Sequence, residues 1–453
     1  MRTILITIPS APLSQGFLRT NFLDTLLEGG DTRAVLLVPQ YREDYYKEEF
    51  GTSPNIVIEA APEPPYKRFE DRVDRFLRQS IPTRTIYNRQ MHGLVSSTGT
   101  LRWARFCGVR ILWMLGHLRA WRTFLRFLYG FSPYRAYLPL IDRLQPNLIF
   151  VTTLMDPMDL GLMKAARRRG TVVVGMPKSW DNLTSKCFMI AHPDHLLVQN
   201  SITKNEAVRY ADFPESQITV CGVPQFDFYF QNDQIVPRDT FLEKIGLSSE
   251  DRYVLFAGEG TDIFVDECEV LEMISDLCSS DSALGGRKIA YRPHPNYRYC
   301  VQTLADRKNI VLAAAQKVLK NTGGGWEFEP ADIRYLLSLL QHADAIMLVA
   351  STLAIEAALL DKPVIGIAFD GKINKPFFRS IRRYYHTTHF DNIVQTSGIR
   401  LAENISGLEN ILRTYIEHPS TDAGGRKRIV SEQVGFTDGK SAERIARALV
   451  QLL

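Results

Sequence analysis

A serine, a threonine and a glutamate in the segment 343–366 are spaced to bind polar groups of a ligand. An apolar run ends at Ala350, and Ser351 and Thr352 follow it at the predicted start of a helix. Free N–H groups at a helix start favour phosphate. Glu356 lies one turn further along the same helix face, where its carboxylate can accept hydrogen bonds from both hydroxyls of a ribose. The plainer alternative is that Ser351 caps the helix and Glu356 is a solvated charge, although its neighbours are apolar.

Two basic side chains, Arg292 and His294, lie in the sequence Tyr-Arg-Pro-His-Pro at 291–295, at the end of a predicted strand. The two prolines stiffen this loop. A guanidinium and an imidazole held there can neutralise a diphosphate as it leaves. Gly258, directly after the strand predicted over 253–257, is assigned to the same binding group. The alternative for 291–295 is a structural loop with an incidental histidine.

The segment 175–186 follows another predicted strand and contains a candidate general base, Asp181. A carboxylate can take the proton of a hydroxyl group if partial burial raises its pKa. The alternative is a turn with an Asx hydrogen bond, and Asp156 is a second candidate base. Further residues are expected on the side of the second substrate: Lys186, and Gly16, Arg19 and Asn21 in the loop after the first strand.

Metal and disulfide chemistry are not expected from this sequence. No Asp-x-Asp occurs, so the usual carboxylate pair for a divalent cation is missing and we expect a reaction without metal or other cofactor. The loop after the first strand is not a Gly-x-Gly-x-x-Gly, which disfavours a dinucleotide. The six cysteines are widely spaced without a Cys-x-x-Cys pair, so a disulfide framework is not expected and a reducing compartment suits them.

The elements that must position these residues alternate between β-branched strands and helical stretches, which is typical of parallel α/β sheets. The first set has strands predicted over 3–8, 34–38, 55–59, 148–152, 172–175, 195–198 and 218–222. Its helices include 17–28, one ending at Gly170, and 203–210 with a Thr203–Glu206 capping box. The second set has strands over 253–257, 288–292, 309–313, 345–349 and 364–369, with helices at about 266–277, 331–342 and 352–360.

This pattern predicts two doubly wound Rossmann-like domains that face a central cleft. The first spans 1–232 and the second 233–440, with a polar linker at 231–250. A C-terminal helix over 441–453 can cross back to the first domain. Ligands of such sheets bind outside the carboxyl ends of the strands.

The charge of the chain is distributed unevenly along its 453 residues. Residues 75–141 contain 11 Arg but no Lys, Asp or Glu, so a net charge of +4 combines +11 in this window with −7 elsewhere. The composition, 45% hydrophobic and 23% charged, excludes a disordered or many-spanning membrane protein. No signal peptide and no uncharged apolar stretch of about 18 residues occurs, so we expect a cytoplasmic protein.

The basic window is predicted to form a helical insertion at about 68–141 in the first domain. Arg119, Arg122 and Arg126 share one helix face, and Trp113 and Trp121 lie close by. Such helices sit at the surface of an anionic membrane, with aromatic side chains among the headgroups. The alternatives are a nucleic-acid site, for which no motif is present, and a packed insertion with arginines at its rim.

Four motifs together resemble the GT-B glycosyltransferase superfamily, in its surface-polysaccharide and CDP-glycerol glycerophosphotransferase-like branch. They are Ser-Thr-Leu-x-x-Glu-Ala with Lys-Pro-Val-Ile, the Arg-Pro-His-Pro loop, Cys-Gly-Val-Pro-Gln-Phe-Asp at 221–227, and Ala-Glu-Arg-Ile at 442–445. The resemblance implies that Glu356 holds the ribose of a nucleotide-linked donor and that Ser351 and Thr352 contact its phosphates. It covers about 218–453.

One departure from that branch bears on the reaction. Where the glycerophosphotransferase-like enzymes have Trp-His-Gly-Thr, this chain has Trp180, Asp181 and Asn182. The departure favours a glycosyltransferase that moves a sugar from a nucleotide-sugar to a surface-polysaccharide or lipid-linked acceptor, with Asp181 as base and His294 at the donor. It would act as a peripheral protein at the inner membrane face, without a nucleic-acid partner. The alternatives are a CDP-glycerol-type polyol-phosphate transferase, a non-hydrolysing nucleotide-sugar epimerase, and a non-catalytic binding protein.

Overall fold

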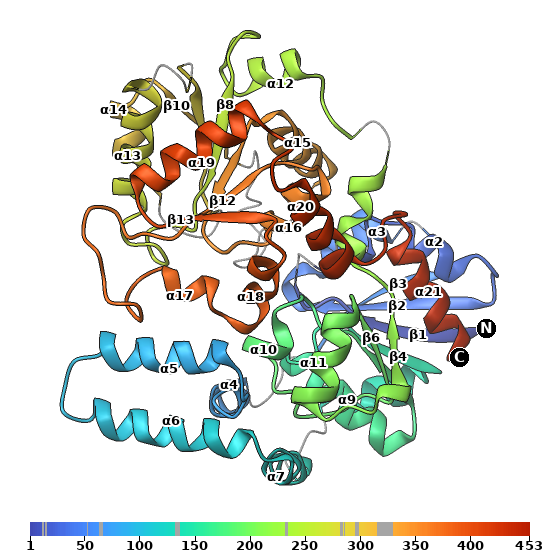
Figure 1. Ribbon diagram of the computed structural model, residues 1–453. Helices are drawn as coiled ribbons and strands as arrows, with labels where there is room; N and C mark the ends of the chain where they lie inside the picture. The colour runs from blue at the N-terminus through green and yellow to red at the C-terminus, as the bar shows by residue number, and fades with distance from the viewer. Residues whose placement is uncertain are drawn as a thin grey trace. The chain divides into compact units, whose positions relative to one another are not determined.

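The computed structural model describes residues 1–10, 13, 16–51, 53–62, 67–131, 136–231, 234–280, 284, 286–294, 299–314 and 329–453. The chain forms two compact units, each built on its own sheet (Figure 1). The first unit contains Met1–Asp227 and Val434–Leu453, and the second contains the described residues from Phe228 to Gln433.

The sheet of the first unit is formed by the apolar runs that the sequence predicts as strands. In the described residues its order is β3-β2-β1-β4-β5-β6-β7, and all pairs are parallel. The strands are β1 (Arg2–Thr7), β2 (Thr32–Pro39), β3 (Ile56–Ala61), β4 (Leu148–Val151), β5 (Val172–Gly175), β6 (His195–Val198) and β7 (Ile218–Val220). The order reverses between β1 and β4, which makes the sheet doubly wound.

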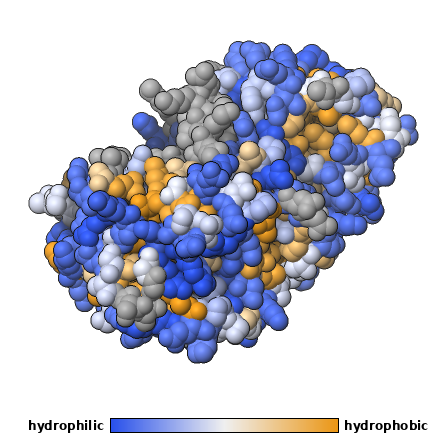
Figure 2. Space-filling view, turned by 90° about the horizontal axis from the view of Figure 1, so that it is seen from above, coloured by the Kyte–Doolittle hydropathy of each residue, from blue (hydrophilic) through white to orange (hydrophobic). Residues whose placement is uncertain are grey.

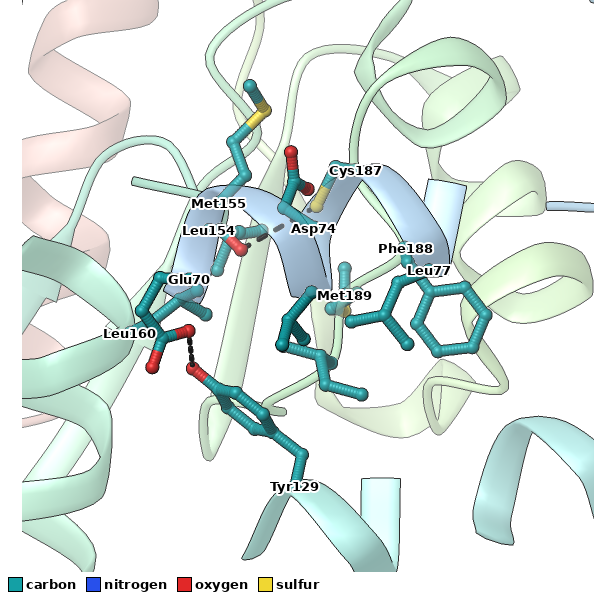
Figure 3. Close-up of a pocket in the computed structure, with 12 residues that line it drawn as sticks. Glu70, Asp74, Leu77, Tyr129, Leu154, Met155, Leu160, Cys187, Phe188 and Met189 are labelled. Carbon is teal, nitrogen blue, oxygen red and sulfur yellow. Dashed lines mark hydrogen bonds between the residues drawn. The ribbon is translucent and has the colours of Figure 1, made fainter. Parts of the chain in front are cut away.

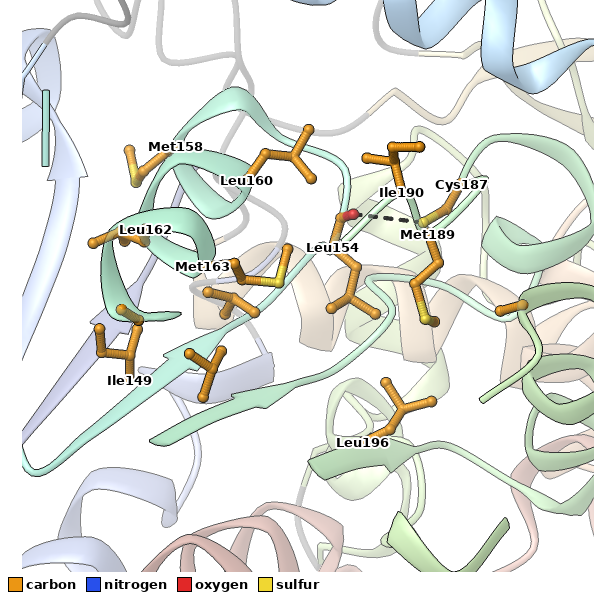
Figure 4. Packing of buried hydrophobic residues seen from close by; sticks show 14 of the residues in the cluster. Ile149, Leu154, Met158, Leu160, Leu162, Met163, Cys187, Met189, Ile190 and Leu196 are labelled. Atoms are coloured by element: carbon orange, nitrogen blue, oxygen red, sulfur yellow. Dashed lines mark hydrogen bonds between the residues drawn. The ribbon is translucent and has the colours of Figure 1, made fainter. Parts of the chain in front are cut away.

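Helices on both faces of this sheet bury its apolar side chains. Figure 4 shows Met158, Leu162 and Met163 of α9 (Pro157–Arg169) packed near Ile149 of β4. The other face is covered by α2 (Phe22–Leu27), α3 (Glu43–Phe50) and α21 (Ser441–Gln451), which belong to a second apolar cluster. As predicted, the helix before β5 ends at Gly170, whose φ of +70° suits glycine.

The capping box predicted at Thr203 and Glu206 is wrong. Helix α11 (Ser201–Ala211) begins earlier, and its cap is Asn200, whose Oδ1 accepts a hydrogen bond from the Thr203 N–H at 2.8 Å. Glu206 therefore does not cap this helix. The residue is buried, with 6% of its surface exposed.

The basic window folds as helices between β3 and β4. They are α4 (Lys67–Arg78), α5 (Arg84–Ser96), α6 (Arg102–Gly116), α7 (Arg119–Gly130) and α8 (Leu138–Leu144). Helix α6 packs on α5 and contacts α7 (Figure 1). The face of the molecule in Figure 2 is mostly hydrophilic, with hydrophobic residues in separate areas. Large apolar side chains are exposed along α6 and α7 and at their ends, namely Trp103, Ile111, Met114, Leu118, Phe124, Phe127, Leu128 and Phe131.

The second unit repeats the same architecture. Its sheet has the order β10-β9-β8-β11-β12-β13 in the described residues, again with parallel pairs throughout. The strands are β8 (Tyr253–Ala257), β9 (Lys288–Arg292), β10 (Ile310–Leu312), β11 (Ile346–Leu348), β12 (Val364–Ile367) and β13 (Ile399–Ala402). The first five match predicted strands. The order reverses between β8 and β11, so the predicted fold class of two Rossmann-like α/β domains is confirmed.

Helices of the second unit include several that the sequence pattern does not reveal. The predicted helices are α13 (Glu267–Ser280), α15 (Pro330–His342) and α16 (Leu353–Leu359), and the others are α14 (Val301–Asp306), α17 (Arg382–Tyr385), α18 (Thr388–Gln395), α19 (Ile405–Glu417) and α20 (Ala423–Ile429). The linker prediction for 231–250 is wrong because this stretch contains α12 (Arg238–Lys244). Phe241 of α12 is fully buried, with its ring centroid 5.3 Å from that of Tyr335.

The expectation of no disulfide is also wrong for one pair. Cys268 on α13 and Cys300 at the start of α14 form a disulfide, with their Cα atoms 5.3 Å apart. The two residues are 32 positions apart in sequence, and only the packing of α13 against α14 brings them together.

Candidate functional site

The switch point of the second sheet brings together the loops after β8 and β11. These strands are neighbours, and Ala257 pairs with Leu348, so the residues that follow both strands emerge at the same edge. The loop after β8 contains Gly258 and Glu259, and the loop after β11 contains Ser351. Ala350 has a φ of +32°, a strained value for a residue with a Cβ. Backbone strain of this kind is concentrated at functional sites.

Glu259 lies at the centre of this edge and is not among the residues predicted from the sequence. The Ser351 hydroxyl interacts with its carboxylate and favours the ionised form. Burial raises the pKa of Glu259 to about 7, with the Ser351 hydrogen bond and Arg292 opposing the shift. The sequence feature that could indicate Glu259 as a site residue is an acidic residue between two glycines at the end of a predicted strand.

The loop around Glu259 is held by a second carboxylate, that of Glu267. Glu267 is fully buried and accepts hydrogen bonds from the N–H groups of Glu259 and Gly260 at 2.8 and 2.7 Å. A Cβ on Gly258 would lie 2.4 Å from Glu267 Oε1. Gly258, predicted as a binding residue, is thus explained by close packing beneath the loop.

Glu356 lies in a charged cluster and is not a solvated surface charge. The Tyr229 hydroxyl donates a hydrogen bond to Glu356 Oε2 at 2.6 Å. Burial raises the pKa of Glu356, while the hydrogen bond from Tyr229 and the charge of Arg292 oppose this shift. Arg292 also interacts electrostatically with Glu259. The structure therefore brings together the predicted residues Arg292, Ser351 and Glu356, and adds Glu259 and Tyr229.

His294 and Thr352 lie at the margins of this cluster. His294 follows Arg292 after the end of β9, and its pKa is lowered by burial and by the Arg292 charge. Its imidazole is therefore mostly neutral at pH 7 and can accept or donate a hydrogen bond. Thr352 is the N-cap residue of α16, but its side chain makes no capping hydrogen bond. Ser351, the alternative cap, lies one residue before this N-cap position, and its hydroxyl interacts with Glu259.

In the first unit, the loop after β5 carries Asp181 in a closed local network. Its Oδ2 lies 2.7 Å from Lys186 Nζ and accepts a hydrogen bond from the Ser185 hydroxyl at 3.1 Å. Lys178 in the same loop donates to Ser10 Oγ at 3.0 Å, which ties this loop to the one after β1. The predicted residues Asp181 and Lys186 are thus paired at the carboxyl edge of the first sheet.

Two polar side chains beside this loop have unsatisfied buried atoms. Gln199 follows β6 and donates to the Pro177 carbonyl at 2.5 Å, but its Oε1 has no hydrogen-bond partner among the residues that the structure describes. Glu206 Oε2 also has none. Burial, followed by the charge of Asp181, raises the pKa of Glu206 to about 8. Buried polar atoms without partners are rare in native proteins, and such groups are frequent at functional sites.

The remaining predicted substrate-side residues have structural contacts. Arg19 donates to Glu49 Oε1 and to the Tyr45 hydroxyl, both at 3.0 Å. A Cβ on Gly16 would meet Pro224 at an ordinary 3.5 Å, and Asn21 is exposed before α2. Asp156, the second candidate base, caps α9 by accepting from the Met158 N–H at 2.9 Å. Nothing in these contacts assigns a substrate to them.

The predicted membrane face of arginines must be corrected. The side chains of Arg122 and Arg126 are 7% and 13% exposed and bind the carboxylate of Asp212 at 2.6 and 2.8 Å, whereas Arg119 is 79% exposed. Asp212 lies at the C-terminal end of α11, so these two arginines fix α7 to the core of the unit. They cannot contact lipid.

The two tryptophans assigned to the membrane surface also pack inward. Trp113 Nε1 donates to the Thr83 carbonyl at 3.0 Å, and Trp121 Nε1 donates to Ser80 Oγ at 3.2 Å. The Arg110 guanidinium stacks 4.2 Å from the Trp113 ring centroid. Both indoles therefore join α6 and α7 to the segment before α5.

Two of the sequence motifs meet in the first unit and have a structural role. Asp227 accepts hydrogen bonds from the N–H groups of Ser441 and Ala442 at 3.0 and 2.8 Å, which caps α21. Gly222 has a φ of +96°, and a Cβ there would lie 2.4 Å from Ser441 Oγ. The motif at 221–227 therefore binds the start of α21, and this helix contains the motif at 442–445.

A small cavity lies in the first unit between α4, α7 and the segment 187–190 (Figure 3). Its water-accessible space is about 20 Å³, enough for about one water molecule. Glu70 accepts a hydrogen bond from the Tyr129 hydroxyl at 3.0 Å along its wall. The cavity is too small for a nucleotide or a sugar.

Within the described ranges, no group of three or more His, Cys, Asp or Glu side chains could hold a metal ion. No helix among the same residues is long and apolar enough to cross a bilayer.

Comparisons with solved structures show a shared fold. The chain resembles the UDP-GlcNAc 2-epimerase of Methanocaldococcus jannaschii with a TM-score of 0.53 at 14% identity, covering 100% of both chains. It resembles the S. aureus MnaA–UDP structure with a TM-score of 0.53 at 11% identity, covering 100% of this chain and 98% of the other. No protein of curated function matches the sequence.

The family comparison covers most of the chain. The model of the family described as CDP-glycerol:poly(glycerophosphate) glycerophosphotransferase matches residues 176–451. This range includes the loop with Asp181, the whole second unit and most of α21. Together with the two Rossmann-like units, the match makes the protein a transferase of GT-B type. The chain belongs to the CDP-glycerol:poly(glycerophosphate) glycerophosphotransferase family.

Proposed function

We propose that the protein transfers a group from a nucleotide-linked donor to a hydroxyl group of an acceptor attached to the cytoplasmic face of a membrane. The observation that carries this proposal is the cluster of Glu259, Arg292, Ser351 and Glu356 at the switch point of the second sheet. Doubly wound sheets bind ligands at this position. An arginine beside two carboxylates offers both an anion site and acceptors for sugar hydroxyls.

Each member of the cluster has a separate task in this proposal. Glu356 accepts hydrogen bonds from the donor ribose, while Tyr229 holds its carboxylate in place. Arg292 neutralises the phosphate that leaves, and His294 supplies a further hydrogen bond to it. Ser351 and Thr352 contact the donor phosphates once the Ser351 hydroxyl leaves Glu259.

Asp181 is the proposed general base for the acceptor. Its carboxylate takes the proton of the acceptor hydroxyl as that oxygen forms its new bond, and the bond to the leaving nucleotide phosphate breaks. Lys186, 2.7 Å away, must shift to free the carboxylate for this step. Arg292 carries the positive charge that offsets the leaving group.

The family match makes glycerol phosphate from CDP-glycerol the first candidate for the transferred group. The second candidate is a sugar from a nucleotide-sugar. It is favoured by Asp181, which stands where the related enzymes have a histidine. A carboxylate base suits attack on an oxocarbenium-like sugar centre.

A screen of donors by thermal shift tests the proposal. CDP-glycerol and UDP-, CDP-, GDP-, CMP- and dTDP-linked sugars are added to the protein separately. A ligand at about 100 times its Kd stabilises the folded state by about 2.7 kcal/mol, so one donor class should raise the Tm. A set of donors without any effect would contradict the proposal.

A further inference from the structure

A disulfide lies next to two of the loops that form the cluster proposed to bind the donor. Cys268 is in the first turn of α13, and Cys300 directly precedes α14. Cys268 follows Glu267, whose carboxylate holds the loop after β8. Cys300 lies six positions after His294, in the connection that begins with Arg292 at the end of β9. The bond therefore joins the helix beneath one of these loops to the far end of the other connection.

The side chain of Tyr291 connects the disulfide to Glu267. The Tyr291 hydroxyl oxygen lies 3.8 Å from Cys300 Sγ, and this hydroxyl donates a hydrogen bond to Glu267 Oε1. The other carboxylate oxygen of Glu267 accepts hydrogen bonds from the N–H groups of Glu259 and Gly260. Tyr291 is fully buried. Because buried side chains are closely packed, a displacement of Cys300 is transmitted through Tyr291 to the loop after β8.

The contacts around the disulfide allow it to be reduced without separating α14 from α13, which lie side by side (Figure 1). Cys268 is only partly buried, so a small thiol can approach the bond from its side. Thr303 of α14 donates a hydrogen bond to Glu272 of α13 at 3.1 Å, and Arg307 pairs with Asp276. These contacts remain when the disulfide is broken, so we expect a local change and not unfolding.

The expected surroundings of this disulfide favour a reversible bond. The proposed function places the protein at the cytoplasmic face of a membrane, and disulfides in such reducing surroundings are usually transient. The thiolate of a low-molecular-weight thiol attacks one sulfur of the pair, which forms a mixed disulfide and releases one protein thiolate. A second thiolate attacks the mixed disulfide, releases the other protein thiolate and leaves as the oxidised reductant. Cys268 and Cys300 thereby gain two electrons and, from the two reductant thiols, two protons.

We propose that the Cys268–Cys300 disulfide is a redox switch that fixes the loop after β8 and thereby sets the affinity for the nucleotide-linked donor. In the oxidised form the bond keeps Tyr291 and Glu267 in place, and with them the backbone of Glu259. Reduction releases Cys300 from α13, so the loop adopts its binding conformation for only part of the time. The apparent Kd for the donor rises by the inverse of that fraction. This inference rests on the proposed function, because the regulated cluster is the same.

Hydrogen exchange measured by mass spectrometry tests the switch without a donor. The full chain is equilibrated with oxidised or reduced glutathione, and the pairing of Cys268 with Cys300 is verified by alkylation and peptide mapping. We expect the amide protons of Glu259 and Gly260 to exchange at least about threefold faster in the reduced protein, since their acceptor carboxylate is no longer fixed. Cys268→Ser should show the faster exchange under both conditions. Cys107→Ser, at an exposed cysteine of the first unit, should respond to glutathione like the wild type.

Several outcomes of this experiment would overturn the proposal. It is overturned if oxidised glutathione leaves Cys268 and Cys300 as thiols, or if the oxidised and reduced proteins exchange at the same rate. It is equally overturned if Cys268→Ser still responds to glutathione. A reduced protein that loses its far-UV circular dichroism would show that the bond is required for folding, and this result also overturns a switch.

Donor binding measured by calorimetry on the same samples separates this proposal from the proposed function. With the donor found in the screen, reduction and Cys268→Ser should each raise the Kd at least about threefold, whereas Cys107→Ser should not. A Kd that reduction leaves unchanged overturns the switch but leaves the donor site standing. Redox-dependent exchange in a protein that binds no donor contradicts the proposed function and supports the redox control of the loop.

Discussion

At the scale of single residues, the candidate site is defined by carboxyl groups that burial keeps partly protonated near neutral pH. Glu259 has a pKa of about 7 and Glu206 one of about 8, both raised mainly by burial. Glu259 lies in the cluster that we propose binds the donor, and the charge of Asp181 acts on Glu206. Their charges can therefore change within the physiological range, with consequences for binding and for stability.

The affinity for the donor should depend on Glu259. Above about pH 7 its carboxylate is ionised and repels the donor diphosphate, whereas the protonated form does not. We expect the Kd for the donor to rise as the pH is increased from 6 to 8, as measured by calorimetry. Glu259→Gln should bind with little change over this range, and Glu250→Gln, at an exposed position, should behave like the wild type. A wild-type Kd that is constant from pH 6 to 8 would contradict this role.

Glu206 should make the stability of the first unit depend on pH. Its folded-state pKa of about 8 is above that of an unfolded glutamate. Between these two pKa values, the Glu206 carboxyl group is protonated in the folded state and ionised in the unfolded state. The contribution to stability is fully present below the unfolded pKa and is lost as the pH rises through about 8. One pKa unit corresponds to about 1.4 kcal/mol.

Thermal melts at pH 5 and pH 8 test this contribution. Glu206→Gln mimics the protonated acid, so it should be more stable than the wild type at pH 8 and have no such advantage at pH 5. Glu215→Gln, an exposed neighbour at the end of the same helix region, serves as the control. Equal pH dependence of the wild type and Glu206→Gln would show that Glu206 is not the responsible group.

At the scale of elements, the helical insertion is fixed by one buried ion-pair group. Asp212 accepts bidentate hydrogen bonds from Arg122 at 2.8 and 2.6 Å and another from Arg126 at 2.8 Å. Burial opposes ionisation of Asp212, but these hydrogen bonds lower its pKa overall. Removing one partner from a buried group of this kind leaves uncompensated charge.

Asp212→Asn should therefore destabilise the first unit by about 3 kcal/mol or more, because two buried guanidinium groups lose their counter-charge. Asparagine tolerates the φ of +57° at this position, so the effect reports on charge. Chemical denaturation followed by circular dichroism gives the free energy of unfolding. Arg119→Ala, at the exposed end of the same helix, should change it by less than about 1 kcal/mol. Similar effects of the two substitutions would contradict this account.

The elements also show how far the sequence can be interpreted. The local periodicity of apolar residues is sufficient to predict the strands β1 to β12 and the helices α9, α13, α15 and α16. These elements are buried on regular faces. It is not sufficient to predict α12, or to show that the arginine face of α7 points inward. The arginines of α7 are satisfied by Asp212, about 90 residues further along the chain, and no local pattern contains that information.

The difference between local pattern and long-range contact also applies to the candidate site. Glu356, Arg292 and Ser351 were accessible because each belongs to a short motif next to a predicted strand. Glu259 and Glu206 were missed because their importance lies in burial and in neighbours distant in sequence. Gly222 and Asp227 were recognised as a motif, but only the structure shows that they anchor α21.

At the scale of the whole molecule, the protein combines two Rossmann-like units with separate chemistry. The second unit contains the cluster that we propose binds the nucleotide-linked donor, and the first contains the proposed base, Asp181. The family match extends over both the loop of Asp181 and the second unit. The proposed transfer from a nucleotide-linked donor to an acceptor hydroxyl uses both features.

The most direct test of this account is nucleotide release from the donor identified in the screen, measured in the presence of acceptor membranes. The wild type should release the nucleotide only when acceptor is present. Glu356→Gln should reduce kcat/KM by at least about tenfold, which corresponds to about 1.4 kcal/mol of transition-state stabilisation, and the exposed control Glu250→Gln should not. Acceptor-independent release, or equal turnover by Glu356→Gln and the wild type, would contradict the assignment of this cluster as the donor site of a transferase.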